Sequence, residues 1–151
     1  MPFFLIFFPI FLFSESAKLI NIVSPTKYEM VIDHDINIVC SLRAISSFES
    51  VKKCRSTKQF NSFTSEYISR RVQENKNYWL EDLELIEDNH YWCNIESKTT
   101  SLSAELLQDG FAIYDENSDV KSALKKQYED AKQAKNGLWY KYQKAMECYE
   151  K

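Results

Sequence analysis

Two histidines and their acidic neighbours are the side chains that could bind a metal or move a proton. His34 stands between Asp33 and Asp35, and His90 follows Asp88 by two residues. Both groups fall in polar segments typical of tight turns, where Asp is common because its side chain bonds the nearby backbone. Their spacing matches no ligand pattern of a zinc site. We therefore interpret both groups as turn residues.

The four cysteines are the other reactive side chains. They are Cys40, Cys54, Cys93 and Cys148, separated by 14, 39 and 55 residues. These spacings also match no zinc pattern. An even number of cysteines in an oxidising compartment indicates disulfides, and four cysteines allow three connectivities. Four buried free thiols are the alternative.

The N-terminal segment predicts export. Residues 1–13 carry no charged side chain and are rich in Phe, Ile and Leu, and Ser14-x-Ser16 fits a small-residue cleavage site. The apolar run is shorter than the roughly 20 residues that span a bilayer. We predict a signal peptide over residues 1–16 and a periplasmic or secreted protein with no membrane span in the mature chain. An uncleaved anchor is the alternative.

Residues 17–151 suit a single domain with one hydrophobic core. Apolar segments predict five strands, at 18–23, 29–33, 36–45, 78–86 and 91–96. Apolar residues at helical spacing predict helices over 58–75, 101–109 and 120–136. The only two glycines, Gly110 and Gly137, follow the last two helices, where a left-handed residue often ends a helix. This order predicts an α+β domain with a small barrel or curled sheet.

The segments around the two glycines resemble the staphylococcal nuclease (thermonuclease) family. Residues 102–112, L-S-A-E-L-L-Q-D-G-F-A, are similar to its helix V-N-x-x-L-V-x-x-G-x-A, and residues 131–139 end in G-L-W as its long helix does. Residues 40–49 lie over its V-R-L-x-G-I-D-x-P-E segment. The resemblance covers about residues 18–149 and implies an OB-fold, a five-stranded β-barrel capped by three helices. In that fold we expect the disulfides Cys40–Cys93 and Cys54–Cys148.

The resemblance also marks active-site positions, and this chain departs from the family at most of them. In the family, a D-G-D-T loop and a later Asp hold Ca²⁺, two arginines contact the phosphate, and a Glu acts as base or orients water. The matching residues here, in that order, are Ser24-Pro25-Thr26-Lys27 with Ser46, then Ser41 and His90, and finally Glu49. Only Glu49 keeps the family's side chain.

The substitutions predict a loss of the family's chemistry. Ca²⁺ takes about six to eight oxygen ligands with several carboxylates, so we expect no bound cofactor where the chain offers hydroxyls. Losing one charge-stabilising donor costs on the order of 10²–10³ in rate. The remaining catalytic candidates are Glu49, His90 and Arg43, which lies two strand positions after Ser41 and so should share its face. A solvated cation is the alternative for Arg43.

The partner is not specified by the sequence. Aromatic residues near the predicted barrel could stack on bases, as in other OB-folds; they are Tyr78, Trp79, Tyr91, Trp92 and Tyr114. Acidic residues crowd the same hairpin and would repel a nucleic acid; they are Glu81, Asp82, Glu84, Glu87 and Asp88. The net charge of -3 also gives nucleic acid only weak support, and a protein partner is an alternative.

The leading hypothesis is therefore an exported thermonuclease-like domain that has lost catalysis and acts as a binding or interaction module. A second hypothesis is a divergent nuclease that uses Glu49 with Arg43 or His90. A third is a structural envelope or secreted protein without a ligand.

Overall fold

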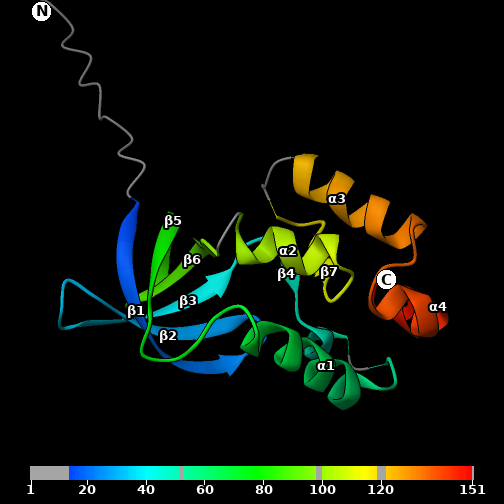
Figure 1. Cartoon of the computed structure of the whole chain (residues 1–151), viewed down its shortest axis with the longest axis horizontal. Coiled ribbons are helices and arrows are strands. Elements are labelled where there is room, and N and C mark those ends of the chain that lie inside the picture. The colour runs from blue at the N-terminus through cyan, green and yellow to red at the C-terminus, as the bar shows by residue number, and fades with distance from the viewer. Residues whose placement is uncertain (1–13, 52, 98–99, 119–121, 151) are drawn as a thin grey trace, which may run out of the picture.

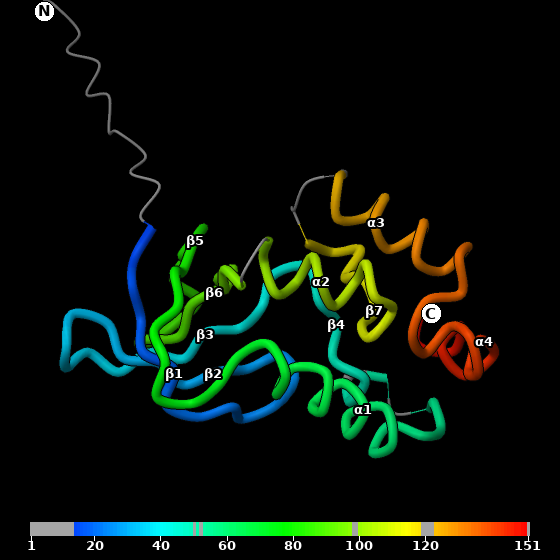
Figure 2. Tube along the Cα trace, viewed as in Figure 1, coloured from blue at the N-terminus to red at the C-terminus, as the bar shows by residue number. Residues whose placement is uncertain are grey.

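The protein is built around a small barrel. The computed structural model describes residues 14–51, 53–97, 100–118 and 122–150. Within these residues, five strands close into a barrel and four α-helices gather on the side away from the turn between β2 (Lys27–Ile32) and β3 (Ile36–Leu42) (Figure 1). The chain trace in Figure 2 shows that the C-terminal helix, α4 (Leu138–Tyr149), lies at the end of the molecule opposite that turn.

The barrel strands follow the order of an OB-fold. They are β1 (Glu15–Ser24), β2 (Lys27–Ile32), β3 (Ile36–Leu42), β5 (Asn77–Glu87) and β6 (His90–Ile95), arranged β1-β2-β3-β6-β5. β1 closes the ring by antiparallel pairing with β5, while β3 pairs with β6 in parallel. A separate short sheet joins β4 (Ile45–Ser46) to β7 (Ile113–Tyr114). The predicted fold class is confirmed.

Alternating side chains fill the barrel. Along β3, Ile38, Cys40 and Leu42 are buried, and the neighbouring strands contribute Met30 and Leu80 to the same core. Because successive strand residues point to opposite faces, the intervening residues of β3 and β6 lie on the outside of the barrel. The candidate site is on that outer face.

The described residues contain four α-helices where the resemblance implied three. They are α1 (Thr57–Ser69), α2 (Leu102–Gln108), α3 (Ser122–Gln133) and α4 (Leu138–Tyr149). The fourth lies where no helix was predicted from the sequence. Leu138, Trp139, Met146 and Tyr149 are all buried, so this segment has an apolar stripe that makes a helix favourable.

The expected role of Gly137 was wrong, while Gly110 follows α2 as predicted. Helix α3 ends at Gln133, and the left-handed residue after it is Lys135, with φ of 56°. Gly137, with φ of 52°, instead precedes α4. Gly110 itself has φ of 76°.

The two glycines lie against each other's backbone. A Cβ atom on Gly110 would stand 2.2 Å from the carbonyl oxygen of Asn136, and one on Gly137 would stand 2.2 Å from that of Asp109. The Leu138 amide donates to the Gly110 carbonyl at 3.0 Å. Both positions therefore need glycine because no side-chain atom fits between the end of α2 and the start of α4.

Two disulfides join Cys40 to Cys93 and Cys54 to Cys148, with Cα–Cα distances of 5.7 and 5.8 Å. This is the pairing expected from the resemblance. The first bond is buried between β3 and β6. The second fastens the end of α4 to the loop before α1, where the Tyr149 hydroxyl also donates to the Arg55 carbonyl at 2.8 Å.

The expected cleavage point after Ser16 lies inside β1. Residues 1–13 of the expected signal peptide are outside the described residues. Glu15 and Ser16 pair with Leu80 and Trp79 of β5, so cleavage after Ser16 would shorten β1 by these two pairs. In the described ranges, no helix is both long and apolar enough to cross a membrane.

Gly110→Ala should lower the free energy of unfolding by about 3 kcal/mol or more, because backbone strain of about 1–3 kcal/mol adds to the collision with Asn136. Lys135→Gly is the matched control. It should change the free energy of unfolding by no more than about 1 kcal/mol. Glycine relieves the strain of the left-handed backbone, but it also raises the conformational entropy of the unfolded chain, and the two effects oppose each other. Urea unfolding measures both. Equal losses in the two variants would contradict the glycine contact.

Replacing Cys54 and Cys148 with serine should lower the free energy of unfolding by up to about 4–5 kcal/mol in the chain-entropy model, since the bond spans 94 residues. Urea unfolding of the variant measures the loss. Non-reducing peptide mapping of the parent protein should return peptides joined through Cys54–Cys148 and Cys40–Cys93. A peptide joined through Cys54–Cys93 would contradict the described pairing.

Candidate functional site

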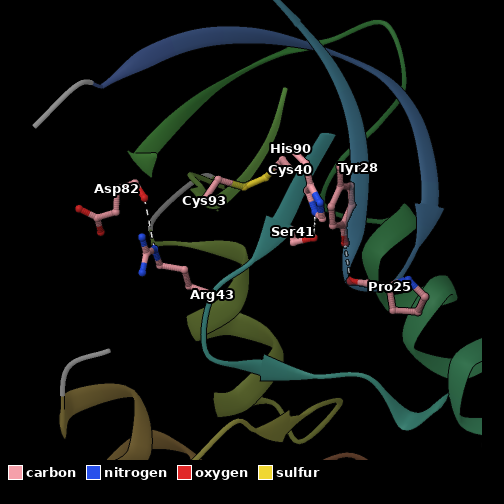
Figure 3. The surroundings of a disulfide bond; sticks show 8 residues. All are labelled: Pro25, Tyr28, Cys40, Ser41, Arg43, Asp82, His90 and Cys93. Atoms are coloured by element: carbon pink, nitrogen blue, oxygen red, sulfur yellow. Dashed lines mark hydrogen bonds between the residues drawn. A yellow bond between two sulfur atoms is a disulfide. The ribbon is translucent and has the colours of Figure 1, made fainter. Parts of the chain in front are cut away.

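Ser41 and His90 meet on the outer face of the barrel. The parallel register sets Val39 opposite His90 and Ser41 opposite Trp92. Ser41 Oγ lies 2.7 Å from His90 Nε2, a hydrogen bond drawn in Figure 3. The resemblance assigns these two positions to the phosphate-binding arginines. The structure brings the positions together, and here a hydroxyl and an imidazole bind each other.

Arg43 is directed to a different place. Its Nε donates to the backbone carbonyl of Asp82 at 3.2 Å, and its guanidinium forms an ion pair with Glu84. Figure 3 shows the side chain pointing toward Asp82 and away from the Ser41–His90 pair. Strand β3 ends one residue before Arg43, so the alternation that predicted a face shared with Ser41 does not extend to it.

Glu49 lies in a short 3₁₀ helix, η1 (Phe48–Ser50), and is exposed. Ser47 begins this helix by accepting a hydrogen bond from the Glu49 amide at 3.1 Å. The Glu49 carboxylate accepts from Asn61 Nδ2 of α1, also at 3.1 Å. The buried Phe48 ring packs edge-on against Tyr149 at 5.0 Å, which anchors η1 to α4.

The three catalytic candidates do not share a contact in the described part of the chain. Glu49 bonds to α1, Arg43 bonds to β5, and His90 bonds to β3. Joint catalysis by Glu49 with either of the others requires that the side chains converge on one substrate atom. These contacts do not favour that hypothesis.

The positions that the resemblance assigns to calcium ligands offer neutral oxygens. Ser24 Oγ and Thr26 Oγ1 lie 3.4 Å apart, and the Pro25 carbonyl accepts from the Tyr28 hydroxyl at 2.9 Å (Figure 3). Burial raises the pKa of Tyr28, so its hydroxyl stays protonated. This donor set does not fit Ca²⁺. Over the described residues, no group of three or more His, Cys, Asp and Glu side chains could hold a metal ion.

A pocket beside Trp92 was not predicted from the sequence. Its volume is about 130 Å³, and its walls come from the barrel and from the segment after β7. The lining residues are Arg43, Ala44, Glu84, Trp92, Asp115, Asn117 and Ser118. Alternation with buried Cys93 marks Trp92 as an outward residue of β6. Residues 115–118 reach the pocket through tertiary packing, which no local sequence pattern predicts.

Comparison with known families identifies the scaffold. The family model described as staphylococcal nuclease homologue matches residues 39–141, which is more than half of the chain. The chain belongs to this family. The matched residues include Ser41, η1, β6 and the Trp92 pocket, so the candidate site lies within the staphylococcal nuclease homologue domain. A search of curated proteins found no match to the chain.

Ser41→Ala should lower the free energy of unfolding of this staphylococcal nuclease homologue by about 1 kcal/mol, because it removes the hydrogen bond of the half-buried His90. Ser24→Ala is the matched control, since its contact with Thr26 is long, at 3.4 Å, and should cost little. Urea unfolding compares the two. A control variant as unstable as Ser41→Ala would contradict a special role for the Ser41–His90 bond.

Proposed function

We propose that this protein has lost the family's calcium-dependent phosphodiester hydrolysis and acts as an exported binding module. The observation that carries the proposal is the 2.7 Å hydrogen bond between Ser41 and His90. Both residues stand where the resemblance places arginines that stabilise the charge developing on phosphate. The loss of one such donor typically costs on the order of 10²–10³ in rate, and here both positions differ.

The charges around the site support the same proposal. The guanidinium of Arg43 is already engaged by Glu84 and by the Asp82 carbonyl. Glu87 and Asp88, at the nearby β5–β6 turn, are exposed. A nucleic-acid backbone approaching this face would meet carboxylates, which repel its phosphates.

Export is supported by two features of the chain. The uncharged segment 1–13 followed by Ser14-x-Ser16 fits a secretory signal. Two disulfides are compatible with an oxidising compartment.

The purified protein should not degrade plasmid DNA when Ca²⁺ is added, under conditions in which an active thermonuclease degrades it completely. Gel electrophoresis with and without a calcium chelator measures the difference. Robust calcium-dependent cleavage that disappears in Glu49→Ala would refute the proposal. Cleavage that is also lost in Arg43→Gln or His90→Gln would refute it as well and would support the divergent-nuclease hypothesis.

A further inference from the structure

Large apolar side chains are exposed beside acidic ones on the β5–β6 hairpin. Leu85 is 60% exposed, Ile86 40% and Trp92 39%. Trp92 lies directly opposite Glu84, and Glu87 lies opposite His90 at the turn end of the hairpin. Trp92 and Glu84 therefore form one exposed surface of the hairpin, whereas Leu85, which follows Glu84 along β5, points to the other face.

The Trp92 pocket opens on this surface and has a fixed acidic wall. The backbone of Asp115 is held in place, because its amide donates a hydrogen bond to the Ala44 carbonyl at 2.9 Å. Its Oδ1 accepts from the Asn117 amide at 3.0 Å. The carboxylate is therefore oriented by the turn that follows β7, and it lines the pocket together with Trp92 and Glu84.

Arg43, the cationic residue in the pocket lining, does not neutralise the negative charge of the pocket. Arg43 lines the pocket, but its side chain is only 17% exposed and its charge is paired with Glu84. Asp115 then remains as an additional carboxylate, and exposed Glu87 lies at the end of the same hairpin. A ligand cation would be attracted here, while a phosphate would be repelled.

We propose that the Trp92 pocket binds a lysine or arginine side chain from a basic segment of a partner protein. The cation would lie over the indole of Trp92, a contact favoured by the ring's negative face, and would pair with Asp115 and Glu84. A volume of about 130 Å³ suits one side-chain head group; pockets for drug-sized ligands usually enclose about 300 Å³ or more. The inference rests on the proposed binding function and names the class of partner.

Fluorescence anisotropy with labelled hexa-arginine and hexa-lysine peptides tests the proposal on the full chain, with hexa-glutamate as the control probe. The basic peptides should bind, more weakly as salt is raised. Trp92→Ala should weaken binding about tenfold, within the range expected for a cation–π contact. Trp79→Ala is the matched control, because Trp79 is 57% exposed but pairs with Ser16 at the opposite end of β5. It should leave the affinity unchanged.

Charge variants give effects of opposite sign. Asp115→Asn keeps the acceptor for the Asn117 amide and should weaken binding several-fold. Glu84→Gln should weaken it further, because it also releases the positive charge of Arg43. Arg43→Gln should tighten binding several-fold, because it frees Glu84 for the ligand. A merely structural role for the Arg43–Glu84 pair would predict losses in both variants, and urea unfolding of each checks that the fold is kept.

Three results would overturn the inference. These are no binding of the basic peptides, an equal loss in Trp92→Ala and Trp79→Ala, and tighter binding of a six-nucleotide single strand than of hexa-arginine. The plasmid assay is independent of all three. If the basic peptides do not bind and the plasmid is not cleaved, only this inference is rejected. Calcium-dependent cleavage of the plasmid rejects the proposed function.

Discussion

The parallel pairing of β3 with β6 determines where every candidate side chain lies. It joins two neighbouring barrel strands, brings Cys40 within reach of Cys93, and sets Ser41 beside His90. Because parallel strands need a long connection between them, the chain that runs from β3 to β6 must leave the barrel and return. That connection contains η1 and α1, and so it also carries Glu49. This one strand pairing therefore positions side chains both in the core and on the outer face of the barrel.

The fold could largely be predicted because its signals are local. The apolar pattern of residues 36–45 predicted the strand that is observed as β3, and the helix before Gly110 is marked by its own apolar stripe. The role of Gly137 could not be predicted, because it depends on the carbonyl of Asp109, which is distant in sequence. Helix α4 was missed for another reason. The resemblance implied three helices, although Met146 and Tyr149 carry a helical apolar pattern.

The residues of the candidate site could be identified from the sequence, but the partners that their side chains contact could not. Aligning motifs identified Ser41 and His90 as equivalents of two arginines, and the structure joins them. Which partner Arg43 takes could not be inferred, since β3 ends just before it and Glu84 approaches from β5. The Trp92 pocket combines groups from β6 and from the segment after β7, so only the folded chain assembles it. Side chains near strand ends are therefore the least predictable part of such a site.

The contact between Gly110 and Gly137 has a consequence for how this family is recognised. A side chain at either position would collide with a backbone carbonyl, that of Asn136 for Gly110 and that of Asp109 for Gly137, so neither glycine can be replaced without moving the backbone. Sequence similarity at these two positions therefore reflects a packing requirement of the fold. A family match that depends on such positions identifies the architecture, and the activity has to be judged from the side chains on the outer face of the barrel.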